Sequence, residues 1–240
     1  MNAKIGLDKC LTFINCEIQP KPRPRRATAE GPRWRAVTIS RQTGSGGHIV
    51  AEELAKKLQG KLCPEGRPWT VFDRNLVEKV LEDHHLPLRL ARFMPEDRVS
   101  EMSDTIEELL GLHPPSYTLL RQTAETILRL ADLGNVIIIG RGAHVITGKM
   151  DTVFHVRLVA PLETRIARVQ ETFKLSRKAA MEKIETEDRG KKRYLKKYFD
   201  ADIDDPLQYH VVINTGRLPE AEAAELIART LLEEQPDARR

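Results

Sequence analysis

A cluster of glycines placed directly between an apolar strand and an amphipathic helix is the feature that most limits what this chain can fold into. Residues 40–48 have the sequence Ser-Arg-Gln-Thr-Gly-Ser-Gly-Gly-His and follow the alternating segment 35–40. Residues 49–58 then repeat apolar side chains at helical spacing. Consecutive glycines at such a junction let backbone N–H groups curl around a phosphate, and the helix start adds positive potential. A tight turn that binds nothing is the alternative for this motif alone.

A dinucleotide-binding loop of the GxGxxG type is a second alternative, and it would begin at Gly44 and Gly46. Ile49 stands where the third glycine of that loop belongs, so the sequence argues against it. We therefore expect a phosphate group to be bound by the loop residues themselves, namely Gly44, Ser45, Gly46, Gly47 and His48.

The rest of the chain alternates between short apolar runs and segments with helical spacing. Strands separated by helices favour a parallel sheet covered on both faces. The strands are expected at 35–40, 70–73, 135–140, 152–158 and 210–214, and the helices at 49–58, 74–82, 96–110, 116–133, 161–173, 176–198 and 219–232.

Ligands of such sheets bind beyond the carboxyl ends of the strands. Polar and glycine residues follow four of the expected strands, at 40–47, 73–74, 140–142 and 214–215. Because these segments meet at one edge of the sheet, we expect them to form a single site.

Residues 1–34 differ in pattern from the rest and are expected to be an N-terminal extension to a domain at 35–240. Apolar residues at helical spacing favour a short helix near the start, and a Pro- and Arg-rich stretch follows at 19–26. One interpretation is a tether with a loosely docked helix, and the other is a contact with a protein partner or a polyanion.

Composition narrows the class of protein further. The chain has 240 residues, a net charge of +4 and a pI near 9.0, a balance that suits anionic ligands such as nucleotides. We find no nucleic-acid reader motif, so nucleic acid is not the expected partner. The three cysteines lack metal-ligand spacing and no apolar stretch reaches the roughly 18–20 residues that cross a bilayer. These features predict a cytoplasmic protein without a membrane or metal-ligand site.

Five motifs in order resemble those of nucleoside monophosphate kinases in the P-loop superfamily, most closely the cytidylate kinase-like family. The resemblance covers residues 35–232. Besides the glycine loop it is carried by Phe72-Asp73-Arg74, by the Gly-Arg element at 139–142, by the arginine-rich segment 187–193 and by the approach to the last strand at 204–215.

The resemblance implies an ATP-dependent phosphotransferase that acts on a nucleoside monophosphate similar to CMP or dCMP. It implies a three-layer P-loop fold with a five-stranded parallel sheet and a basic helical lid at about 174–200. ATP and Mg²⁺ are the implied cofactors, although the sequence does not identify the Mg²⁺ site. The implied acceptor ligands are Asp73, Arg74 and Arg141, and the implied transition-state cations are Arg41, Arg189 and Arg193.

The loop departs from the usual GxxxxGK[ST] pattern at three positions. Arg41 stands at the first glycine, Gly47 at the lysine and His48 at the Mg²⁺-binding hydroxyl. Ile139 also replaces an acidic residue of cytidylate kinases, and Gly142 replaces an acceptor-contacting aspartate. A non-catalytic nucleotide-binding protein and a kinase of another small acceptor therefore remain as alternatives.

Each candidate side chain also has a plain structural interpretation. The basic run on the lid is an exposed solvated face in that interpretation, and Arg141 forms an ion pair with a helix carboxylate. Asp73 caps the helix that is expected to start near residue 75. The histidines at 84, 85 and 113 have no partners at metal-ligand spacing and are interpreted as surface residues.

Overall fold

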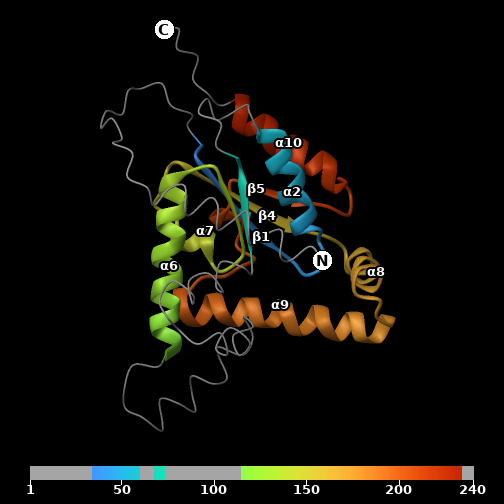
Figure 1. Cartoon of the computed structure of the whole chain (residues 1–240). Helices are drawn as coiled ribbons and strands as arrows, with labels where there is room; N and C mark the ends of the chain where they lie inside the picture. The colour runs from blue at the N-terminus through green and yellow to red at the C-terminus, as the bar shows by residue number, and fades with distance from the viewer. Residues whose placement is uncertain (1–33, 60–67, 74–114, 234–240) are drawn as a thin grey trace, which may run out of the picture.

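The computed structural model of the chain describes residues 34–59, 68–73 and 115–233 (Figure 1). Residues 1–33 of the expected extension, Arg74, and the helices expected at 74–82 and 96–110 lie outside the described residues. The elements are β1 (Ala36–Arg41), α2 (Gly47–Leu58), β2 (Thr70–Phe72), α6 (Pro115–Leu133), β3 (Val136–Ile139), α7 (Ala143–Ile146), β4 (Val153–Val159), α8 (Leu162–Phe173), α9 (Arg177–Phe199), a 3₁₀ turn (Pro206–Gln208), β5 (Val211–Asn214) and α10 (Glu220–Glu233).

The five strands form one parallel sheet in the order β2-β3-β1-β4-β5. β1 lies at the centre and pairs with both β3 and β4 over most of its length. With helices on both faces of the sheet, this is the expected three-layer arrangement, and it brings the glycine loop to the middle of the sheet edge (Figure 1).

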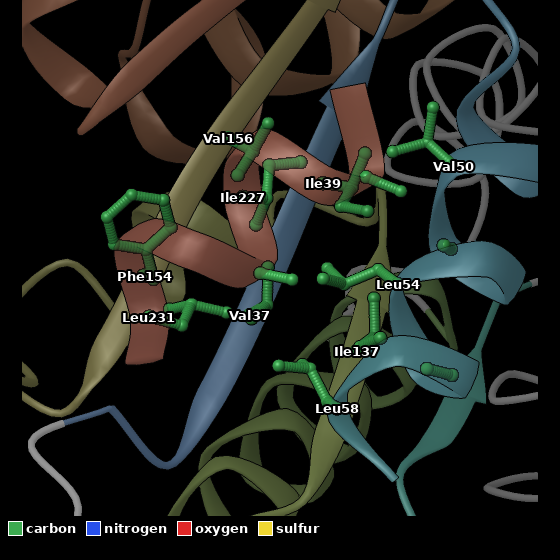
Figure 2. Packing of buried hydrophobic residues seen from close by; sticks show 14 of the residues in the cluster. Val37, Ile39, Val50, Leu54, Leu58, Ile137, Phe154, Val156, Ile227 and Leu231 are labelled. Carbon is green, nitrogen blue, oxygen red and sulfur yellow. The ribbon is translucent and has the colours of Figure 1, made fainter. Parts of the chain in front are cut away.

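One face of the sheet packs against α2 and α10 through apolar side chains alone. Val37 and Ile39 of β1 contribute to this layer, since residues two apart in a strand share a face. Leu54 and Leu58 of α2 and Ile227 of α10 cover them and are fully or almost fully buried (Figure 2). Burying each of these side chains stabilises the fold by roughly 1.5–3 kcal/mol.

The opposite face is divided into an apolar half and a polar half. Its apolar half lies against α6 and includes Val136, Ile138 and Ile127. In its polar half β1 and β4 present Thr38, Ser40, His155 and Arg157, all buried. The Thr38 hydroxyl lies 2.7 Å from His155 Nδ1, so the polar half is held by hydrogen bonds between side chains.

The helix α9 is 23 residues long and corresponds to the expected lid at about 174–200. Ala180 and Ile184 near its start pack against Ile166 and Val169 of α8. Further along, Tyr194 and Leu195 pack against Ile203 and a residue of α6, and Figure 1 shows α9 running from α8 towards α6. The helix is therefore attached to the domain at both of its ends.

Two elements were not expected from the sequence, the helix α7 and the 3₁₀ turn. α7 has four residues, too few for a periodic apolar pattern to appear. It follows three successive residues with positive φ, at 140–142. Trp34, which we expected in the extension, is instead 3% exposed and packs edge-on against Phe154, with ring centroids 5.0 Å apart.

No helix among the described residues is both long enough and apolar enough to span a bilayer.

Candidate phosphate-binding site

The loop between β1 and α2 is held by hydrogen bonds within itself and to β5. The Ser45 hydroxyl donates to the Gln42 carbonyl oxygen at 2.8 Å, and the Thr215 hydroxyl donates to the Ser45 carbonyl oxygen at 2.9 Å. Ser45 is fully buried. The loop is therefore fixed by its own contacts, as a preorganised binding loop would be.

Positive φ angles make glycine necessary at two loop positions. Gly44 has φ 81° and Gly46 has φ 77°, and side chains rarely adopt such values. A Cβ on Gly44 would also come within 2.7 Å of the Arg165 carbonyl oxygen, and one on Gly46 within 2.7 Å of the Glu220 side chain. The loop thus packs closely between α8 and α10.

The start of α2 carries no side-chain cap and no acidic residue in its first turn. The N-terminal N–H groups of a helix attract anions when no cap neutralises them. His48, at the second position of α2, lies with its Nδ1 3.6 Å from a carboxylate oxygen of Asp73, which follows β2. The structure therefore brings Asp73 to the edge of the loop, next to His48.

Two carboxylates of α9 contact this loop. Asp188 Oδ1 accepts a hydrogen bond from the Thr43 backbone N–H at 2.8 Å, and Glu187 Oε2 accepts one from the Thr43 hydroxyl at 2.9 Å. The Lys191 ammonium donates to the same hydroxyl at 2.5 Å. Arg165 of α8 donates to the other Asp188 oxygen at 2.7 Å. The Asp188 carboxylate of the protein itself thus accepts from a backbone N–H group of the loop.

The surroundings of Asp188 keep this carboxylate ionised. Burial alone would raise its pKa, but the Lys191 ammonium and the hydrogen bonds from Thr43 outweigh burial, and the net result is a lowered pKa. Asp188 therefore carries a full negative charge near neutral pH while it contacts the loop.

A pocket beside the loop is lined by three cationic side chains from three different elements. Arg41 comes from the end of β1, Arg141 from the turn after β3 and Lys191 from α9. Arg141 has φ 57°, an uncommon value for a residue with a side chain. The remaining lining residues are Ser40, Gly140, Gly142, His144, Tyr194, Leu195 and Ile203, none of them acidic. The pocket has a volume of about 20 Å³, which is room for roughly one water-sized group, so only part of an anion fits into it in this structure.

A buried network lies under this pocket. The Arg157 guanidinium donates to the Ser40 hydroxyl at 2.9 Å and to an Asp204 carboxylate oxygen at 3.0 Å. Burial, followed by the charges of His155 and Arg157, lowers the pKa of His144 to about 4, so this pocket residue is neutral at physiological pH. The positive charge of the pocket therefore comes from Arg41, Arg141 and Lys191, and not from its histidine.

Most of the residues expected at the site are brought together by the fold. The loop residues 44–48 are contiguous, and Arg41 and Arg141 line one pocket. Arg189 and Arg193, by contrast, lie on the exposed side of α9. Four residues apart, both can point at one phosphate cluster when the lid closes, and this role stays a prediction, since the loop is contacted here by another side of the helix.

Sequence reasoning missed Lys191, Asp188 and Arg165. A signal for Lys191 was present, because it lies seven residues after Ile184 and four before Leu195, on the buried stripe of α9. A lysine in an apolar stripe indicates a buried, paired charge. The segment 189–197 contains several lysines and arginines, so the sequence did not single out Lys191 among them.

Comparisons with known proteins agree with this architecture. The cytidylate kinase-like family matches residues 36–217 of the chain. A solved structure of an uncharacterized protein from Eubacterium ventriosum is similar, with a TM-score of 0.61 and 18% identity over 84% of this chain and 99% of that chain. At this identity the likeness shows the fold alone. A shikimate kinase from Bacteroides thetaiotaomicron has a TM-score of 0.46 and 16% identity over 83% of this chain and 98% of that chain.

One curated protein is also similar over part of the chain. It is a uronate isomerase from Corynebacterium glutamicum, 28% identical over 116 residues, which make up 48% of this chain and 22% of that protein. The chain thus spans about a fifth of the length of this relative. A match of this extent does not transfer the activity of that protein.

Proposed function

The chain belongs to the cytidylate kinase-like family, and from that premise we propose that it is an ATP-dependent phosphotransferase whose acceptor is a nucleoside monophosphate similar to CMP or dCMP. The observation that carries the proposal is the pocket in which Arg41, Arg141 and Lys191 converge beside the glycine loop. Phosphoryl transfer depends mainly on positioning the two substrates and on balancing the negative charge of the transferred group. A cationic pocket next to a phosphate loop supplies both requirements.

In the proposed reaction a phosphate oxygen of the acceptor forms a bond to the γ-phosphorus of ATP, and the bond to the β-phosphate oxygen breaks to release ADP. Backbone N–H groups of Gly44–Gly47 hold the donor phosphates at the start of α2. Arg141, with Asp73 and Arg74, holds the acceptor. Arg41 neutralises charge on the transferred group, joined by Arg189 and Arg193 when the lid closes.

Mg²⁺ would accompany ATP in this proposal and shield the charge of its phosphates. The described residues contain no cluster of three or more histidine, cysteine or acidic side chains that could hold a metal ion. Mg²⁺ in kinase sites is commonly bound by one or two carboxylates together with substrate phosphates. In this proposal the Asp73 carboxylate, beside the start of α2, would serve Mg²⁺ as well as the acceptor.

A non-catalytic nucleotide-binding protein is the second candidate, and a specific observation favours it. The loop lacks the usual lysine and hydroxyl, and a carboxylate of α9 occupies one of its backbone donors. A protein that binds a nucleotide and changes the position of α9 would need no turnover. A kinase of another small acceptor is the third candidate, since the pocket recognises charge and not a particular base.

Turnover distinguishes these candidates. The full chain is incubated with MgATP and a panel of nucleoside monophosphates, and ADP formation is followed. We expect one cytidine-type acceptor to raise ADP formation well above the ATPase background. ADP formation with none of the acceptors, in a preparation that binds ATP, would reject the kinase and leave the binding protein.

Arg141→Lys sharpens the test of the acceptor site. The substitution keeps a positive charge but removes the two parallel donors of a guanidinium. We expect kcat/KM for the acceptor to fall about tenfold, as for the loss of one charge-assisted hydrogen bond, with ATP affinity unchanged. Arg229→Lys on the exposed side of α10 is the matched control, and it should leave both quantities as in the wild type. Equal kcat/KM in all three proteins would remove Arg141 from the acceptor site.

A further inference from the structure

The space beside Gly47, where the usual loop has its lysine, is partly filled by the side chain of Arg41. A Cβ on Gly47 would lie 3.0 Å from Cγ of Arg41 and 3.2 Å from its Cβ. The aliphatic stem of Arg41 therefore covers the point at which a lysine would leave the loop. Any cation that replaces this lysine has to reach the loop from another element.

Lys191 reaches the loop from α9. Only 10% of its side chain is exposed, and its ammonium contacts the Thr43 hydroxyl at 2.5 Å and Asp188 Oδ1 at 3.1 Å. Removing an ammonium from water is costly unless the charge is paired, so a buried lysine indicates a partner that must be negative. In this structure the partner is the carboxylate of Asp188, a residue of the same helix that also contacts the loop.

Asp188 has the contacts that a phosphate oxygen would have at this position. One of its oxygens accepts from the Thr43 backbone N–H and from Lys191, and the other accepts from Arg165. A backbone N–H, an ammonium and a guanidinium that converge on one anion are typical of phosphate sites. The donors that a phosphate would need are thus already in place, and the Asp188 carboxylate accepts from them.

We propose that Lys191 is the phosphate-binding cation of this loop, delivered by α9 in place of the lysine absent at position 47. Asp188 holds the place of the phosphate, and the terminal phosphate of a bound nucleotide takes over its donors. The proposal rests on the proposed function only in that the ligand is a nucleoside triphosphate. It predicts that removing the charge of Lys191 weakens ATP binding. Removing the charge of Asp188, three positions earlier on α9, should instead strengthen it.

ATP affinity of the full chain, measured by calorimetric titration, tests the cation. Lys191→Met keeps the apolar stem and removes the charge, so we expect ATP to bind about 10–100-fold more weakly, as for the loss of a charge-assisted hydrogen bond. Adenosine affinity should change less than about threefold, because adenosine has no phosphate for Lys191 to contact, whereas a purely structural effect would weaken both ligands alike. Lys191→Arg should retain most of the affinity. Lys178 is an exposed lysine of the same helix, so Lys178→Met is the matched control. Its ATP affinity should stay within about twofold of the wild type.

Asp188→Asn tests the anion and gives a second route if Lys191→Met does not fold. The amide still accepts from Thr43 but no longer carries the charge that competes with phosphate, so we expect ATP to bind about 3–10-fold more tightly. Asp200→Asn is its matched control, since Asp200 is exposed and ends α9 in a left-handed conformation that asparagine also adopts. Affinity for ATP in the control should stay as in the wild type.

The outcomes separate this proposal from the proposed function. Wild-type affinity in Lys191→Met, or unchanged affinity in Asp188→Asn, would overturn the role of Lys191 even if the enzyme turns over. Opposite shifts in the two variants without turnover would support Lys191 and reject the kinase. If the wild-type chain binds no ATP at millimolar concentration, both proposals are wrong.

Discussion

The face of the sheet under α2 and α10 and the opposite face, towards α6 and α9, are built from alternate residues of the same strands. β1 gives Val37 and Ile39 to the first face and Thr38 and Ser40 to the second. The first face is closed by apolar contacts, whereas the second carries buried side chains joined by hydrogen bonds and an ion pair, as between Arg157, Ser40 and Asp204. Apolar packing depends little on pH or ligands, but paired charges respond to both. The face under α2 and α10 is therefore a rigid support, and the opposite face is where a ligand can alter the structure.

The dependence of stability on pH should show this difference most strongly. Burial is the largest cause that lowers the pKa of both His144 and His155 to about 4, and both lie on the α9 side of the sheet. The unfolded chain takes up these protons near pH 6.5, whereas the folded chain does so only near pH 4. Stability is therefore complete above pH 6.5 and is lost as the pH falls towards 4, by roughly 3 kcal/mol for each histidine.

Chemical denaturation at a series of pH values measures this loss. His144→Gln removes one titrating group, so the fall in unfolding free energy between pH 6.5 and pH 4 should be smaller in this variant than in the wild type. The same slope in both proteins would show that His144 does not couple this face to pH.

Leu54→Ala tests the other face. Leu54 is fully buried between α2 and the sheet, so its truncation should lower the free energy of unfolding by about 2–5 kcal/mol. Because the side chains that surround Leu54 in this cluster are apolar, the loss should be about the same at pH 7 and pH 5. Leu226→Ala on α10, where the side chain is 46% exposed, is the control and should cost much less. If the loss of unfolding free energy in Leu54→Ala differed between pH 7 and pH 5, the face under α2 and α10 would also respond to pH.

Arg193→Ala compares the two sides of α9 itself. If the exposed arginines act in the transition state, kcat should fall about 10²–10³-fold while ATP affinity changes far less. Lys197→Ala is the control on the same exposed side and should have little effect. Near wild-type kcat in both variants would assign the catalytic charge to the inner side of the helix, where Lys191 lies.

The smallest effect is expected from the N-terminal extension. A chain that begins at Trp34, without residues 1–33, should bind ATP within about twofold of the full chain, because these residues precede the first strand of the domain. A chain that begins at residue 35 should bind as well but unfold more easily, since Trp34 is buried against Phe154. Loss of ATP affinity in a folded chain without residues 1–33 would show that the extension belongs to the site.

The five strands and the five longer helices among the described residues could be predicted to within two residues because apolar periodicity determines them. The strand expected at 152–158 occupies Val153–Val159, and the helix expected at 176–198 occupies Arg177–Phe199. The glycine loop was equally visible, since positive φ angles restrict its residue types.

The orientation of the charged residues could not be predicted in the same way. A helix as polar as α9 offers several cations on every side, so its rotation is decided by a few residues such as Ile184 and Leu195. The Thr43 hydroxyl that accepts from Lys191 lies in the glycine loop, 148 residues away in the chain, and no local pattern connects the two. Long-range pairing of charges is therefore the part of the site that only the structure reveals.

The contact between Arg41 and Gly47 has a consequence for how this loop can change over evolution. Because the stem of Arg41 fills the volume next to residue 47, a lysine introduced there alone would meet it, and a glycine at position 41 alone would leave a gap. The two positions should therefore vary together among relatives, with a large residue at one and a small residue at the other. Two substitutions, at positions 41 and 47, therefore separate this loop from the GxxxxGK pattern.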